Sequence, residues 1–406
     1  MIRSLNIRDT SSKTNECKSS RLNLAFVLFT NIAIGAGTET TILAYVKNLK
    51  EMDQDLKITI VQTDAMFTSN NKPIEKLRDI DVITFKSPHA MKVYRLLEQF
   101  PSIYYLIYIF IYIILNNKKI RSISKECDVI YFVNQLDILP WGIFNPNVRS
   151  KTVISGQCGF FSNFSNKIQG KLSFRKILGK LSFKLYNKYP FSLHYLTKLQ
   201  MLDVGRNEKQ DFLLPSGVET DNFHPINRND DVTSFVYFGR VDKSKGVPEL
   251  LEAFKKYPFT DSTLTIIGTG DTAKAVESQK SKNIKYLGYI DRESLYREIP
   301  NYDIFIFPTH GDIFPLVVVE AVSSGLFCLV SDNLKGIFDD LESIGAIEYI
   351  SNTVDGILQA MIKYHGFKVL YEKKLEWHEF IKEHYDWKDI SRRLYEKLMV
   401  IAKRKE

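Results

Sequence analysis

The sequence has few cysteines and no cysteine motif. Its 406 residues include four cysteines, which lie far apart and form no Cys-x-x-Cys pair. This spacing is typical neither of a disulfide framework nor of a cysteine zinc site, and it favours the reducing cytoplasm. His89, His194 and His310 have no metal-ligand spacing either. We therefore expect no bound metal.

Long apolar runs are also missing. The longest, 103–115, has thirteen residues, and a membrane-spanning helix needs about 20. Residues 1–20 are polar, unlike a signal peptide, and we expect a flexible tail there. Within the apolar run, Tyr104, Tyr108 and Tyr112 recur every four residues and would line one side of a helix. Such a stripe is typical of a helix at a membrane surface, and a buried helix of an α/β domain explains the run equally well.

One part of the chain lacks carboxylates. Fifty-five Lys and Arg against 47 Asp and Glu give a net charge of +8, and no carboxylate lies between Asp137 and Asp203, where ten Lys and Arg occur. A basic amphipathic helix over 167–188 would suit phosphate-bearing partners such as anionic lipid head groups, although an ordinary solvated helix face explains it as well. No nucleic-acid-binding motif accompanies it, so we expect no nucleic-acid partner.

Short apolar runs alternate with helical patterns in two successive halves of the chain. The length suits two or three domains, and the alternation predicts an α/β fold with two Rossmann-like, doubly wound parallel sheets facing a central cleft. We expect domains at 21–205 and 206–385, joined near 213–225. The expected strands are 22–30, 57–62, 82–85, 129–133 and 152–155 in the first half, and 234–238, 263–267, 284–286, 304–307 and 328–331 in the second.

Two cations follow the first strand of the second half. The segment Gly239-Arg240-Val241-Asp242-Lys243-Ser244-Lys245-Gly246 lies between a predicted strand and a predicted helix. The planar guanidinium of Arg240 can grip phosphate oxygens, and Lys245 adds a point charge near a helix N-terminus, which itself attracts anions. The segment predicts a diphosphate site, with a basic surface turn as the simpler alternative.

Two carboxylates occur where a later strand leads into a helix. Asp312 belongs to the predicted loop and Glu320 to the following helix, so that both can face the cleft. The unpaired backbone N–H groups of 314–317 could bind a sugar hydroxyl or a phosphate oxygen. Alternatively, Asp312 caps the helix and Glu320 is solvated.

Taken in order, these segments resemble glycosyltransferase family 4, whose members have the GT-B fold, use nucleotide sugars and retain the anomeric configuration. Each segment alone is weakly specific for the family, whereas seven of them in the family's order make a strong resemblance. The matching segments are 35–39, 215–219, 239–246, 267–270, 287–289, 303–308 and 312–320.

The resemblance implies a role for each matching residue. Arg240 and Lys245 would neutralise the donor diphosphate and stabilise the departing nucleotide, with Asp312 as the third catalytic residue. Glu320 would accept hydrogen bonds from the ribose, and Gly35 and Gly37 would close onto the diphosphate or the acceptor. The remaining donor-binding residues would be Gly239, Gly268, Tyr289, Phe314, Pro315, Leu316 and Val317. A C-terminal helix, 386–406, would cross back to the first domain.

The sequence departs from the family pattern in three places. Asp312 replaces a longer glutamate, which could alter the contact with the donor sugar. Pro315 has no N–H, so one donor is missing. Many relatives have a histidine where this chain has the segment around Gln157. No catalytic base can be assigned there.

We therefore expect a retaining glycosyltransferase without a metal or other cofactor, in which a donor phosphate oxygen helps to deprotonate the acceptor. The acceptor would be a lipid-linked or growing saccharide at the cytoplasmic membrane face, with 103–115 and 167–188 contacting anionic lipid. The alternatives are a soluble acceptor and an inactive relative that binds nucleotide sugars. A nicotinamide oxidoreductase is disfavoured, because the turn at Gly35 and Gly37 lacks the third glycine.

Overall fold

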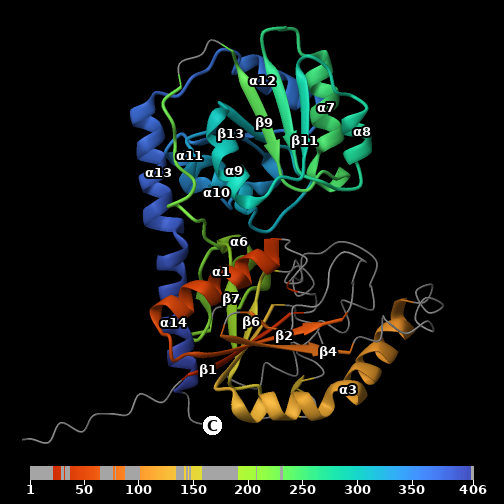
Figure 1. Ribbon diagram of the computed structural model, residues 1–406, viewed down its shortest axis with the longest axis vertical. Helices are drawn as coiled ribbons and strands as arrows, with labels where there is room; N and C mark the ends of the chain where they lie inside the picture. Colours follow the sequence, from red (N-terminus) through yellow and green to blue (C-terminus); the bar gives the residue numbers. More distant parts are fainter. Residues whose placement is uncertain are drawn as a thin grey trace, which may run out of the picture.

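The computed structural model shows two α/β domains, one above the other, with the C-terminal helices running along one side of both (Figure 1). The expected tail at 1–20, Gly35 and the basic segment 167–188 lie outside the residues that the structure describes. The described residues are 22–28, 32, 37–64, 76–77, 79–86, 101–133, 141–142, 145, 148–157, 191–206, 208–228 and 232–403.

The first domain has an eight-stranded sheet of order β3-β4-β2-β1-β5-β6-β7-β8, parallel except for β3. All five strands expected from the sequence are present, because parallel strands covered on both faces consist of apolar residues. The strands are β1 (Asn23–Val27), β2 (Lys57–Thr63), β3 (Lys76–Leu77), β4 (Ile80–Phe85), β5 (Val129–Phe132), β6 (Thr152–Ser155), β7 (Ser192–Tyr195) and β8 (Phe212–Leu213). Since β7 pairs with β8, this sheet extends past residue 205, and the expected boundary is too early.

Helices cover both faces of this sheet. Successive residues of β1 point to opposite faces, so that Leu24 and Phe26 pack under α1 (Gly37–Met52) while Ala25 and Val27 pack under α3 (Pro101–Glu126). A short helix, α6 (Lys198–Val204), follows β7.

The apolar run 103–115 forms part of α3. Tyr112 is buried against Phe85, which favours the alternative of a buried helix at this position. Among the α3 side chains that the structure describes, the exposed apolar ones are Phe110, Ile114 and Leu115. Among the described helices, none is long and apolar enough to cross a membrane.

The second domain has a six-stranded parallel sheet of order β11-β10-β9-β12-β13-β14. The expected strands are confirmed to within two residues, and β14 was not expected. The strands are β9 (Ser234–Phe238), β10 (Thr263–Ile267), β11 (Ile284–Gly288), β12 (Ile304–Phe307), β13 (Phe327–Ser331) and β14 (Ile347–Ile350). The helices are α7 (Val247–Lys256), α8 (Ala273–Glu277), α9 (Arg292–Glu298), α10 (Leu316–Ser323), α11 (Asp339–Ser343) and α12 (Val354–Lys363).

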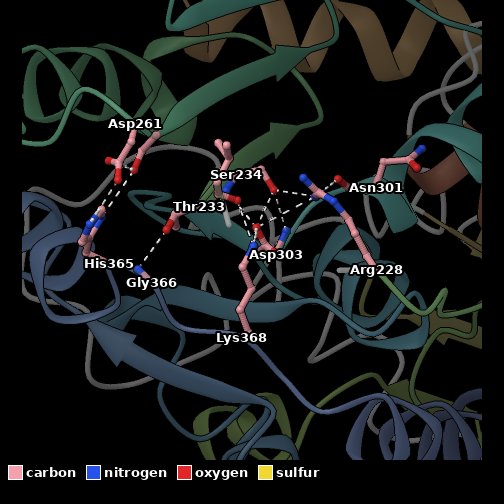
Figure 2. Close-up of polar contacts among 11 residues, drawn as sticks. Arg228, Thr233, Ser234, Asp261, Asn301, Asp303, His365, Gly366 and Lys368 are labelled. Atoms are coloured by element: carbon pink, nitrogen blue, oxygen red, sulfur yellow. Dashed lines mark hydrogen bonds and ion pairs between the residues drawn. The ribbon is translucent and has the colours of Figure 1, made fainter. Parts of the chain in front are cut away.

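A buried carboxylate holds the second sheet together at the amino ends of β9 and β12 (Figure 2). Asp303 accepts hydrogen bonds from the backbone N–H and the hydroxyl of Ser234, at 2.9 and 2.7 Å. Its counter-charges are Lys368, with Nζ 2.8 Å away, and Arg228 at 3.9 Å. The cluster thus ties the segment entering the domain and the segment after α12 to the sheet, and its place at the amino ends indicates a structural role.

The C-terminal helices join the two domains. Trp377 and Ile381 of α13 (Tyr371–Tyr385) belong to the second core, whereas Ile390 and Leu394 of α14 (Trp387–Ala402) belong to the first, where α14 packs beside α1 (Figure 1). The chain thus returns to the first domain through α14. Between the two helices, Asp386 accepts a hydrogen bond from the N–H of Lys388 at 2.8 Å and so caps α14.

The break between α13 and α14 lies against the connection that follows β8. Val218 donates its N–H to the carbonyl of Tyr385 at 2.8 Å and accepts from the N–H of Trp387 at 3.2 Å. A Cβ on Gly217 would come within 2.8 Å of both Tyr385 O and the Trp387 ring. The two segments that connect the domains are therefore in contact with each other.

We predict that Leu394→Ala destabilises the first domain by about 3 kcal/mol, because Leu394 is fully buried in its core. The rate of hydrogen exchange of the β1 and β2 amides measures this destabilisation. Truncation after Asp386 should increase that rate further. The matched control is Val400→Ala, an exposed position on the same helix. Unchanged exchange in Leu394→Ala and in the truncated chain would contradict the prediction.

A second prediction concerns acid stability and His194, which is buried at the end of β7. Its Nε2–H donates to the Leu214 carbonyl at 2.7 Å, which leaves Nδ1 to accept from the Tyr131 hydroxyl at 2.6 Å, so the neutral ring satisfies both partners. Burial lowers the pKa of His194 from 6.5 to about 4.

Because the unfolded chain binds the proton more tightly, the stability that neutral His194 provides is complete above pH 6.5 and is lost as the pH falls from 6.5 towards 4. The loss should reach about 3 kcal/mol. The free energy of unfolding, measured in urea, should depend more steeply on pH in the wild type than in His194→Gln over this pH range. Parallel stability curves would show that His194 does not titrate on unfolding.

Candidate functional site

A cleft of about 340 Å³ lies between the two domains. In each sheet the strand order reverses, between β1 and β5 and between β9 and β12, and open α/β sheets bind ligands at the carboxyl ends of the strands at such a point. Nine expected residues line the cleft: Gly37, Gly239, Arg240, Lys245, Asp312, Phe314, Pro315, Leu316 and Val317. Residues not expected there also line it: Thr38, Thr41, Gln157, Leu196, Ser216, Phe307 and Ile313.

Glycines let the loops of the second domain pack backbone against backbone. Gly246 has a φ of 71°, and a Cβ there would lie 2.0 Å from the carbonyl oxygen of Pro308. Gly268 has a φ of 128°, and a Cβ there would lie 1.9 Å from the carbonyl oxygen of Gly239. A side chain at either position would push the loops apart. Gly268 does not line the cleft and instead supports the loop that does.

Lys245 and Asp312 meet at the wall of the cleft. The Lys245 Nζ lies 2.6 Å from Asp312 Oδ2, and the side chains are 13% and 27% exposed. Arg240 is mostly exposed, with its Nε 3.4 Å from Asp242. A preorganised ammonium and a solvated guanidinium thus flank one cavity, where a diphosphate would find two cations.

Asp312 does not cap the following helix. The capping position of α10 is Pro315, which has no capping side-chain hydrogen bond. The N–H groups of Leu316 and Val317 in the first turn lack intrahelical partners, whereas Pro315 offers no donor at all. Phe314 packs against Phe338 and lines the cleft. The capping alternative is therefore wrong, and two amides remain to bind an anion.

Glu320 lies one turn further along α10, is buried and does not itself line the cleft, so the solvated alternative is also wrong. Its Oε1 lies 2.7 Å from Nη2 of Arg292, the first residue of α9. Burial lowers the pKa of Arg292, but Glu320 and Tyr296 outweigh this effect and hold it above its ordinary value. We did not expect Arg292 here, because the start of α9 and α10 come together only in the folded domain.

One further expected residue lies outside the cleft, and one residue that was not expected lies in it. Tyr289 is largely exposed and does not line the cleft. Gln157 follows β6 and lines the cleft, in the segment that departs from the family pattern, and neither atom of its amide has a hydrogen-bond partner among the described residues. An amide can orient a hydroxyl but cannot accept a proton as a base.

Metal-binding groups are not gathered in the part of the chain that the structure describes, where no three His, Cys, Asp or Glu side chains come together. Asp53 and Asp55 lie in the turn between α1 and β2, at the opposite end of the sheet from the cleft. Asp53 accepts a hydrogen bond from the Tyr395 hydroxyl at 2.9 Å and so has a structural partner.

Residues 218–343, most of the second domain, match the family model "Glycosyl transferases group 1". The second domain resembles a glycosyltransferase. The match contains Arg240, Lys245, Arg292, Asp312 and Glu320, and it supports a GT-B glycosyltransferase.

Two curated relatives and one solved structure extend the comparison. The chain is 23% identical over 202 residues to the phosphatidylinositol N-acetylglucosaminyltransferase GPI3 subunit of Saccharomyces cerevisiae, covering 45% of this chain and 44% of that protein. It is 30% identical over 129 residues to a phosphatidyl-myo-inositol mannosyltransferase of Mycobacterium tuberculosis, covering 29% and 34%. The chain thus spans less than half the length of these relatives.

The solved structure is that of Anabaena HepE in complex with UDP-glucose. It superposes with a TM-score of 0.67 at 14% identity and covers 94% of this chain and all of that one. At this identity the likeness shows the fold alone. Two Rossmann-like domains across a cleft are confirmed as a GT-B fold.

Proposed function

We propose that this protein is a retaining glycosyltransferase that takes its sugar from a nucleoside diphosphate sugar bound in the interdomain cleft. The observation that carries the proposal is the placement of Arg240 and Lys245 at the switch point of the second sheet, within the part of the chain that matches glycosyl transferases. A paired cation site at strand ends suits a diphosphate.

The donor would bind with its diphosphate against Arg240, Lys245 and the free amides of α10. A phosphate oxygen would replace Asp312 as the partner of Lys245, which frees the Asp312 carboxylate to accept from a sugar hydroxyl. The ribose hydroxyls would donate to Glu320. The two cations supply the positive charge that a metal ion provides in other enzymes, and a metal-independent reaction is part of the proposal.

In the transfer step, the bond between the sugar's anomeric carbon and the phosphate oxygen breaks, and the electron pair leaves with the nucleoside diphosphate. The acceptor oxygen forms the new bond on the same face of the sugar. The acceptor proton passes to a donor phosphate oxygen, because Gln157 cannot take it. Arg240 and Lys245 stabilise the charge that develops on the departing diphosphate.

The proposed acceptor is a lipid-linked or growing saccharide at the cytoplasmic face of a membrane. Both curated relatives carry phosphatidylinositol in their names. On this chain, Phe110 and Ile114 are 66% and 62% exposed on α3, and the exposed Lys118 and Arg121 follow them on the same helix. An apolar patch next to cations is typical of a helix that docks on anionic lipid. A soluble saccharide acceptor is the alternative.

We predict that calorimetry detects binding of one of UDP, GDP and ADP, and that Lys245→Ala raises its Kd about tenfold or more, because a charge-assisted phosphate contact is lost. The matched control is Lys243→Ala in the same turn, which does not line the cleft. If none of the three binds, or if both variants weaken binding equally, the donor site is wrong. Binding without sugar transfer would identify an inactive relative.

A further prediction concerns binding of the protein to lipid membranes. The protein should sediment with phosphatidylglycerol vesicles more than with phosphatidylcholine vesicles, and Phe110→Ser combined with Ile114→Ser should weaken this binding about tenfold or more through lost apolar burial. Leu370→Ser, an equally exposed apolar position in the second domain, is the control. Failure to bind either vesicle would favour the soluble acceptor.

A further inference from the structure

Arg292 connects three parts of the chain through one guanidinium. Its Nη2 lies 2.7 Å from Glu320 Oε1 on α10, and its Nε donates to the Tyr296 hydroxyl at 3.1 Å. The same Nε lies 3.6 Å from Oε2 of Glu219, in the connection that follows β8. The guanidinium carbon lies 5.0 and 5.3 Å from the ring centres of Phe223 and Tyr296.

Glu320 requires such a partner. Its side chain is only 4% exposed, and a carboxylate withdrawn from water is costly unless a counter-charge and hydrogen bonds replace the solvent. Arg292 supplies both. A carboxylate has about four lone-pair positions, so the contact with Arg292 leaves acceptor positions open on Glu320.

We propose that Arg292 is a positioning residue that holds the Glu320 carboxylate in the orientation that accepts the two ribose hydroxyls of the donor nucleotide. This inference rests on the proposed function. Arg292 itself does not touch the ribose. It determines whether Glu320 presents two fixed acceptor oxygens or a carboxylate whose rotamer varies.

The contacts explain why this position holds an arginine. The planar guanidinium directs Nη2 to Glu320 and Nε to Tyr296 at the same time, which a single ammonium cannot do in this geometry. The faces of Phe223 and Tyr296 restrict the plane of the guanidinium. The Tyr296 hydroxyl donates onward to Glu219, so the orientation of Arg292 is fixed from the interdomain connection.

The test separates recognition of the ribose from recognition of the diphosphate. Calorimetry is carried out on the full chain with UDP, GDP and ADP, with the 2′,3′-dideoxy counterpart of each, and with inorganic pyrophosphate. We expect Arg292→Gln to raise the Kd of the ribonucleotide that binds the wild type about tenfold, and to change the Kd of its dideoxy counterpart and of pyrophosphate less than about twofold. In a Glu320→Gln background, Arg292→Gln should have no further effect.

Arg297→Gln, an exposed position on the same helix, is the matched control and should bind like the wild type. Arg292→Lys keeps the charge and the fold if the neutral variant fails to fold, and it should weaken ribonucleotide binding selectively, though less. Equal weakening of ribonucleotide and dideoxynucleotide, no change, or tighter binding would overturn the inference while leaving the donor site intact. Failure of the wild type to bind any of the three nucleotides would instead overturn the proposed function, and this inference with it.

Discussion

The close approach of two loop backbones at the carboxyl end of the second sheet is the constraint on which the candidate site depends. Gly246 lies against the Pro308 carbonyl, at a distance that no side chain would allow. This contact brings the turn after β9 to the loop after β12, and with it Lys245 to Asp312. The cations therefore face the cleft because a glycine permits the packing, and the ion pair is a consequence of that packing.

The second constraint is that the two segments that connect the domains lie in contact with each other. The connection after β8 and the break at Asp386 are joined by backbone hydrogen bonds of Val218. Glu219, the next residue, is also the point at which Arg292 and Tyr296 contact this connection. The connection between the domains is thus linked through Arg292 to the carboxylate proposed to bind the ribose.

The sequence predicts the second domain closely, because its parallel strands are covered on both faces and appear as continuous apolar runs, such as β9 and β12. It predicts less of the first domain. The strand β7 contains a serine and a histidine, and its polar groups are satisfied only by partners far along the chain, such as Tyr131 for His194. The same holds at the site. Arg240, Lys245 and Asp312 follow strand ends and can be found from spacing, whereas Arg292 gains its partners on α10 and on the interdomain connection only in the folded chain.

The central claim is that a nucleoside diphosphate sugar binds between Lys245 and Glu320. A crystal structure of the protein with the nucleoside diphosphate that binds it tests this claim most directly. The account predicts that the diphosphate contacts Arg240, Lys245 and the first turn of α10, that Lys245 exchanges Asp312 for a phosphate oxygen, and that the ribose hydroxyls meet Glu320 while Arg292 stays in place. A nucleotide bound away from the carboxyl ends of β9 and β12, or with its ribose away from Glu320, would contradict it.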